Sequence, residues 1–143
     1  MTVAFTSAEL AFIEQQRVAR LATAGRDGRP HIVPICFALL DGRLYSVIDD
    51  KPKRSARLQR LRNVAADPRA TLLFDRYGED WTTLAWVMVY AAADLTPDAE
   101  AGAAIEALKA RYPQYSTLAP EGRSVLRFTP ERVVSWRLAG RGG

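Results

Sequence analysis

Two Asp-Gly pairs divide residues 18–48, VARLATAGRDGRPHIVPICFALLDGRLYSVI, into three strand-like runs. Asp27-Gly28 separates the first run, Val18–Ala24, from the second, His31–Leu40, and Asp41-Gly42 separates the second from Arg43–Ile48. An Asp-Gly pair between apolar runs is a strong hairpin signal, because glycine accepts the positive φ that such turns require. These residues predict an antiparallel meander of three strands.

The rest of the chain predicts three helices and further strands. Thr6 and Glu9 have the spacing of a capping box at the start of a helix, and Thr96-Pro97 has the cap-then-proline order of another. In a third helix, Leu58, Leu61 and Ala65 share one face. The expected helices are 6–17, 54–66 and one that begins after Pro97, and the further expected strands are 69–75, 84–93 and 124–138, with an interruption at Pro130.

This order of elements predicts a mainly β, α+β fold with six to seven antiparallel strands and about three helices. Closure of the strands into a barrel, with helices at its ends, removes the exposed edges that an open sheet of this size would leave. Strand 84–93 is almost uniformly apolar, so we expect burial on both faces, or on one face plus a subunit interface. We expect one domain over residues 5–138 and a C-terminal tail over 139–143.

The composition excludes several classes of protein. The chain has 143 residues, of which 48% are hydrophobic and 25% charged, which is typical of a globular protein and not of a disordered one. The single cysteine, Cys36, excludes an internal disulfide and a multi-cysteine metal site. No apolar run is long enough to cross a bilayer, and no leader pattern is visible, so we expect a cytoplasmic protein without membrane contact.

A basic cluster is the first candidate for chemistry. The net charge is +4, and six basic residues fall between Lys51 and Arg62. The run 51–57, KPKRSAR, lies at the predicted start of a helix, where free N–H groups and the helix dipole favour anions. Its four basic side chains are suited to phosphate or carboxylate; they are Lys51, Lys53, Arg54 and Arg57. The alternative is that they only keep the helix soluble.

His31 and the tryptophans are the remaining candidates. His31 is the single histidine, which excludes a multi-histidine metal site, and it is either a polar surface residue or a contact to a ligand ring. Trp81 follows Glu79-Asp80 in an expected loop, where a ligand or a second subunit would have to cover it. Trp86 and Trp136 are expected in the core. No dinucleotide fingerprint, P-loop, nucleophile elbow or CxxC motif is present.

The whole pattern resembles the pyridoxamine-phosphate-oxidase-like split β-barrels, and within them an actinobacterial subgroup of the F420-dependent (deazaflavin) oxidoreductases. The likeness covers residues 5 to 138 and depends on the order of several short motifs. These are Leu21–Ala24, Asp27–Pro34, Asp50–Lys53, Leu61–Asn63, Asp67–Arg69, Asp75–Trp81 and Arg111–Tyr115.

The resemblance implies a homodimer with the cofactor in a groove between the subunits. By that match, the cofactor ring or ribityl chain is bordered by Ser46, Val47 and Ile48, and the groove is lined by Pro30, His31 and Val33. The phosphate and the anionic tail would be held by Lys51, Lys53, Arg54 and Arg57. Trp81 would come from the partner chain.

The cofactor expected is F420, because the large basic cluster suits a polyanionic tail; FMN is the alternative. The implied activity is hydride transfer to a small unsaturated or carbonyl-containing organic substrate. A protein that holds the cofactor without turnover has the same binding residues and stays an alternative. Nucleic acid is an unfavoured partner, because the basic run is short and lacks interleaved aromatic residues.

Overall fold

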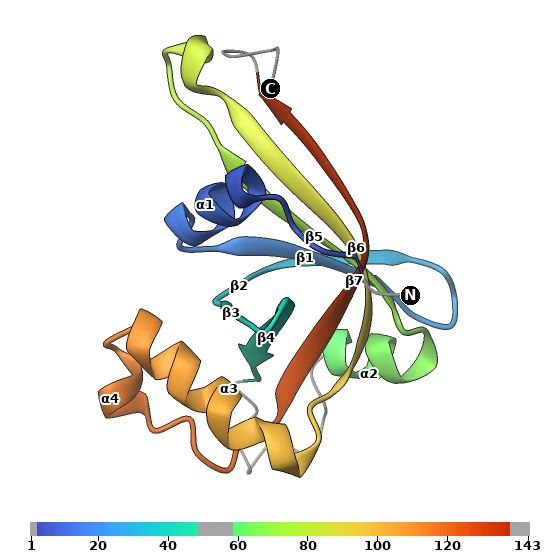
Figure 1. Cartoon of the computed structure of the whole chain (residues 1–143). Helices are drawn as coiled ribbons and strands as arrows, with labels where there is room; N and C mark the ends of the chain where they lie inside the picture. The colour runs from blue at the N-terminus through green and yellow to red at the C-terminus, as the bar shows by residue number, and fades with distance from the viewer. Residues whose placement is uncertain (1–2, 49–58, 138–143) are drawn as a thin grey trace.

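A computed structural model describes residues 3–48 and 59–137, which form one curled antiparallel sheet with four α-helices around it (Figure 1). The strands are β1 (Ala19–Ala24), β2 (Pro30–Ile35), β3 (Ala38–Leu40), β4 (Arg43–Val47), β5 (Arg69–Arg76), β6 (Ala85–Leu95) and β7 (Val125–Arg137). The helices are α1 (Ser7–Gln15), α2 (Gln59–Ala66), α3 (Asp98–Arg111) and α4 (Tyr115–Leu118), with a 3₁₀ turn, η1, at Trp81–Thr83.

The strand order is β2-β1-β5-β6-β7-β4-β3, so the expected three-stranded meander is wrong. Both Asp-Gly hairpins form as expected, and Gly28 and Gly42 have φ of 76° and 77°. The run 31–40, however, is two strands that lie at opposite ends of the sheet, joined by Cys36-Phe37. The two ends of the curled sheet are therefore connected by the chain itself at this corner. Among the described residues, β2 and β3 do not form a hydrogen-bonded ladder.

Helix α3 fastens this corner from outside. The Tyr112 hydroxyl accepts a hydrogen bond from the Phe37 N–H (3.0 Å) and donates one to the Arg17 carbonyl oxygen (2.9 Å). Arg111 donates to the carbonyl oxygens of Glu14 and Gln16 at the end of α1. The end of α3 thus holds the β2–β3 corner and the end of α1 together.

The core fills the concave side of the sheet. Its largest fully buried side chains include Phe37, Phe74 and Phe128, and Phe12 and Ile13 of α1 pack into it. A second cluster lies on the outer side of β3 and β4 under α3, and it includes Tyr45, Val47 and Leu108. β4 is therefore covered on both faces, because Leu44, Ser46 and Ile48 alternate with Tyr45 and Val47.

Two predictions of burial are wrong. Helix α2 buries Leu61, Asn63 and Val64, while Ala65 is exposed. Trp86 and Trp136 lie opposite one another on the outer face of β6 and β7, where Trp136 is 44% exposed. Strand β6 alternates between buried and less buried residues, so only one of its faces belongs to the core. From the apolar run 84–93 alone, a face buried in the core could not be told from an apolar face that lies outside it.

Strand β7 continues across Pro130. A register shift at Tyr90/Ala91 places Glu131 in a bulge, so β7 stays one strand of 13 residues. Among the described residues, no helix is long and apolar enough to span a membrane.

Candidate functional site

Among the described residues, the backbone of β4 has no partner on one side at Val47. The Ile48 N–H donates to the Ser124 carbonyl oxygen at 2.7 Å, on the β7 side. Successive residues of an antiparallel strand direct their N–H and C=O groups to opposite neighbouring strands. The N–H and C=O of Val47 therefore point away from β7, toward the β3 side. There β3 pairs with β4 only as far as Tyr45. Within the described ranges no residue pairs with Val47 on that side, so one donor and one acceptor lack a partner there. They face the seam of the barrel, which is the place where the two ends of the sheet, β2 and the β3–β4 pair, meet.

A buried polar cluster lies where α2 meets the β1–β2 hairpin. Asn63 is 1% exposed; its Nδ2 donates to the Thr23 hydroxyl (3.1 Å), and its Oδ1 accepts from Gln59 Nε2 (2.7 Å). His31 lies directly opposite Thr23 in the ladder. Its Nδ1 is buried and has no hydrogen-bond partner among the described residues. Because a buried unpaired nitrogen is costly, this atom marks a place for a ligand's hydrogen-bonding group.

Gly25 lets the hairpin approach α2 this closely. A Cβ at Gly25 would lie 2.7 Å from Asn63 Oδ1, which is shorter than real Cβ contacts. The contact borders a pocket of about 330 Å³ that exposes two arginines. The pocket is lined by Gly25, Arg26, Asp27, Gln59, Arg62, Asn63 and Ala66. Two arginines against one aspartate make the lining net positive, which favours an anionic group.

A larger groove of about 450 Å³ lies on the outer face of β1, β5 and β6. Small side chains such as Ala22, Ala24 and Thr71 form much of its lining. At one end Arg69 donates from Nε and from its terminal nitrogen to the Asp67 carboxylate, at 3.1 and 2.8 Å. These hydrogen bonds lower the pKa of Asp67 to about 2. The carboxylate at this end of the groove is therefore ionised at neutral pH.

The predicted groove residues of β2 lie on different faces of the strand. Pro30 is exposed and lines the outer groove, whereas His31 and Val33 lie on the face that packs toward the core. Successive strand residues alternate between faces, so these three side chains cannot all contact one ligand from the same side.

The predicted β4 residues differ in what they can offer. The side chains of Ser46 and Ile48 are buried, at 3% and 0% exposure, so at these positions contact with a ligand would have to involve the backbone. The Val47 side chain is buried on the other face of β4, in the cluster under α3, and Val47 has the N–H and C=O without partners described above. Lys51, Lys53, Arg54 and Arg57 lie outside the described residues.

Trp81 lies at the opposite end of the sheet from α2. Strand β5 begins at Arg69, beside α2, and ends at Arg76, from where the chain leads to Trp81 at the tip of the β5–β6 connection (Figure 1). The indole is 61% exposed, and its N–H donates to the Tyr77 hydroxyl at 3.3 Å. Within one chain, Trp81 is therefore remote from His31 and Asn63.

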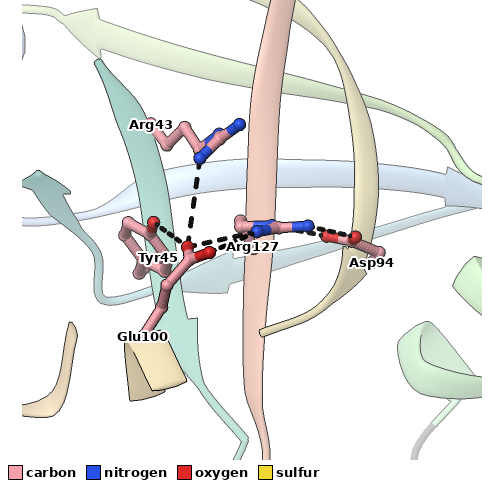
Figure 2. Close-up of polar contacts among 5 residues, drawn as sticks. All are labelled: Arg43, Tyr45, Asp94, Glu100 and Arg127. Atoms are coloured by element: carbon pink, nitrogen blue, oxygen red, sulfur yellow. Dashed lines mark hydrogen bonds and ion pairs between the residues drawn. The ribbon is translucent and has the colours of Figure 1, made fainter. Parts of the chain in front are cut away.

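A charged network fixes α3 against β4, β6 and β7 (Figure 2). Arg127 donates to both oxygens of Asp94 (3.0 and 2.7 Å) and to both oxygens of Glu100 (3.1 and 3.0 Å). The Tyr45 hydroxyl also donates to Glu100, at 3.2 Å. Burial, followed by this hydrogen bond, raises the pKa of Tyr45. The network holds Tyr45 two residues before Val47, and thus fixes the end of β4.

Sequence reasoning missed Asn63, Thr23 and the network around Arg127. An asparagine among the buried positions of an amphipathic helix is a weak signal, because its partners Thr23 and Gly25 lie in a distant hairpin. Arg127 and Asp94 come from strands that are paired only in the fold. No spacing in the sequence indicates either contact.

These features define a class: an antiparallel barrel that closes through a chain corner and leaves open backbone groups beside that seam. The sequence agrees, because the family model for pyridoxamine 5'-phosphate oxidase matches residues 5–137. The chain belongs to the pyridoxamine 5'-phosphate oxidase family of split barrels.

Three known proteins are similar to this chain. A 5a,11a-dehydrotetracycline/5a,11a-dehydrooxytetracycline reductase of Streptomyces rimosus is 26% identical over 137 residues, which cover 95% of this chain and 85% of the relative. A conserved hypothetical protein of Mycobacterium tuberculosis has a crystal structure with a TM-score of 0.75 and 26% identity, covering 96% of this chain and 88% of that one. An FAD-binding protein of Mesorhizobium loti has a TM-score of 0.69 and 21% identity, covering 94% and 95%. At that last identity, the likeness concerns the fold alone.

Proposed function

We propose that the protein is an F420-dependent oxidoreductase that reduces a small unsaturated or carbonyl-containing organic substrate in the cytoplasm. The observation that carries this proposal is the backbone edge of Val47, which has no partner among the described residues. His31 Nδ1, buried beside the β1–β2 hairpin, is a second polar group without a partner there. A flavin or deazaflavin ring has carbonyl and N–H groups along its edge, which match a donor and an acceptor on a strand edge that lacks a ladder partner. The reductase relative from Streptomyces rimosus supports a redox role.

The residues present fit such a cofactor. The Val47 N–H and C=O would hold the ring edge, and Lys51, Lys53, Arg54 and Arg57 would hold phosphate and the anionic tail. Arg26 and Arg62, on the pocket beside Asn63, extend the positive surface. When bound, the reduced deazaflavin would supply a hydride. The chain would orient the ring and keep water away from it.

FMN is the alternative cofactor. Its single phosphate needs fewer basic side chains than the chain provides between Lys51 and Arg62. This excess of positive charge favours F420, because its tail carries several carboxylates. A protein that only stores or shields the cofactor would use the same contacts.

The groove would be completed by a second copy of the chain. Three exposed apolar residues lie on the outer sheet face, where Ile32 is 66%, Trp136 44% and Tyr90 36% exposed, and the half-buried Trp86 lies beside Trp136. Exposed apolar patches of this kind mark interaction surfaces. In a two-fold dimer, the Trp81 end of one chain would reach the seam of the other.

Titration of the purified protein with F420 and with FMN, followed by cofactor and tryptophan fluorescence, tests this proposal. We expect micromolar binding of F420 and weaker binding of FMN, and a dimer by light scattering at micromolar concentration. Steady-state oxidation of reduced F420, with 5a,11a-dehydrotetracycline as the first acceptor, then separates an enzyme from a storage protein. Preference for FMN would reassign the cofactor, and binding of neither would overturn the enzyme proposal.

A further inference from the structure

The Tyr112 hydroxyl lies between two segments that the β1–β2 ladder would otherwise join. In that ladder Ala19 lies opposite Ile35, and the same register, two residues farther, would place Arg17 opposite Phe37. The ladder ends before this point, because β1 begins at Ala19. The hydroxyl instead accepts from the Phe37 N–H at 3.0 Å and donates to the Arg17 carbonyl oxygen at 2.9 Å. It thus occupies the place of a direct N–H···O=C bond between the two strands.

The hydrogen-bonding capacity of this hydroxyl is filled within the chain. It also accepts from Arg111 Nε at 3.2 Å, so it donates once and accepts twice. The tyrosine ring is 6% exposed and is held as well, because the Arg17 guanidinium lies 4.7 Å from its centroid and the Tyr115 ring packs against it edge-on at 5.9 Å. Tyr112 therefore acts by fixing the backbone of its neighbours.

The corner that Tyr112 holds lies next to the open edge of β4. In the β3–β4 ladder Ala38 lies opposite Tyr45, and the same register, two residues farther, would place Cys36 opposite Val47. Such a pair would occupy both the N–H and the C=O of Val47. It does not form, because β3 begins at Ala38. The position of the corner therefore decides whether the backbone edge of Val47 is available to a ligand.

We propose that Tyr112 is a positioning residue for the cofactor. Its hydroxyl, inserted between Arg17 and Phe37, sets the place of the Cys36-Phe37 corner relative to the backbone edge of Val47. Without the hydroxyl, a direct bond from the Phe37 N–H to the Arg17 carbonyl would add one pair to the β1–β2 ladder and move the corner. The role of Val47 as the ring contact rests on the proposed function. The place of the corner does not, because hydrogen bonds within the chain set it.

Tyr112→Phe removes the hydroxyl and keeps the ring. The Phe37 side chain stays buried in the core, so we expect the variant to fold with a lower melting temperature. The first readout is the amide NMR spectrum without cofactor, in which the Cys36 and Val47 signals should move. Val89→Ala truncates a fully buried side chain of β6 and is the control for lost stability. It should leave both signals in place.

The second readout separates the ring contact from the charged contacts. The probe is the deazaflavin ring with its ribityl chain but without phosphate or glutamate, titrated by fluorescence beside F420. Tyr112→Phe should weaken both ligands by about fivefold or more, because they share the ring that the seam holds. Val89→Ala should change neither by more than about twofold. The Lys51→Ala, Lys53→Ala double variant should weaken F420 and leave the ring fragment within about twofold.

Three results would overturn the inference. These are unmoved Cys36 and Val47 signals in Tyr112→Phe, equal movement of the two signals in Val89→Ala, and an unchanged Kd of Tyr112→Phe for a ring fragment that the parent binds. If both signals move as expected but the parent binds neither F420 nor FMN, Tyr112 still sets the place of the corner. The proposed function, and with it the cofactor role of Tyr112, then falls.

Discussion

The two ends of the sheet differ in what they leave unsatisfied. At the α2 end, the polar groups of Asn63 and Thr23 are buried and paired, and His31 Nδ1 is buried without a partner among the described residues. At the other end, Tyr77 and Trp81 are exposed, with Trp136 near them on β7. The α2 end thus has a buried polar atom to which a ligand could hydrogen-bond. The other end has exposed aromatic side chains against which a partner could pack.

The difference suggests that neither end is a complete site in one chain. In a two-fold dimer whose interface includes both ends, the unlike ends of the two subunits can meet, because residue i of one chain contacts residue j of its partner and residue j contacts residue i. We propose that the α2 end of one chain and the Trp81 end of its partner form one cofactor site. The following variants test each end separately.

The largest expected effect on stability is at Asn63. Asn63→Ala removes the hydrogen bonds to Thr23 and Gln59 and leaves a small cavity, so we expect a loss of about 2 kcal/mol in the free energy of unfolding. Urea denaturation measures the loss. Ala65→Ser, at an exposed position of the same helix, is the control and should change stability only slightly. A similar loss in both variants would contradict the role of Asn63.

The largest expected effect on ligand binding is at the basic cluster. The double change Lys51→Ala with Lys53→Ala should weaken F420 at least tenfold, or about 1.4 kcal/mol, because two charges near the phosphate are lost. Fluorescence titration measures it. Lys109→Ala with Arg20→Ala removes two charges elsewhere and should leave the affinity within twofold. An unchanged affinity for F420 in the Lys51/Lys53 variant would show that these two lysines do not belong to the cofactor site.

A smaller effect is expected at the aromatic end. Trp81→Ala should weaken F420 roughly five- to tenfold through loss of one aromatic contact. The melting temperature should stay close to that of the parent, since the side chain is mostly exposed. An unchanged Kd would exclude Trp81 from the cofactor site, whichever chain supplies it.

The smallest effect is the pH dependence at Asp67. Its pKa is lowered from 3.8 to about 2, so its contact with Arg69 stabilises the fold above about pH 4, and this contribution is lost as the pH falls through 2. Asp67→Asn should therefore be slightly less stable than the parent at pH 7, with the difference vanishing near pH 2. Thermal melts across this range measure it. A difference from the parent that stays the same from pH 7 to pH 2 would contradict this contribution.

Much of the fold could be predicted from local signals. The Asp-Gly turns and the Thr6–Glu9 capping box are fixed by a few adjacent residues, and both form as expected. The break at Cys36-Phe37 could not be predicted, because the apolar run continues across it and only the Tyr112 contact, far along the chain, fixes the corner.

The candidate site was predictable only in part. Val47 was identified by resemblance, yet its open backbone edge depends on where the β3 ladder ends. Trp136 was expected in the core because tryptophan in a strand usually is buried, and its exposure follows from the outer face of β6 and β7 lacking a cover within the chain. The expected single domain over 5–138 and the tail over 139–143 stay predictions.

Complementation tests the composite site most directly. The Lys51/Lys53 double variant and Trp81→Ala would be co-expressed with different tags, and the mixed dimer purified. If each site takes its lysines from one chain and its tryptophan from the other, one of the two sites in the mixed dimer is fully intact. Our account predicts parental affinity for F420 at about half of the sites in that dimer. Weakened affinity at every site would show that both groups act within one chain and would contradict the account.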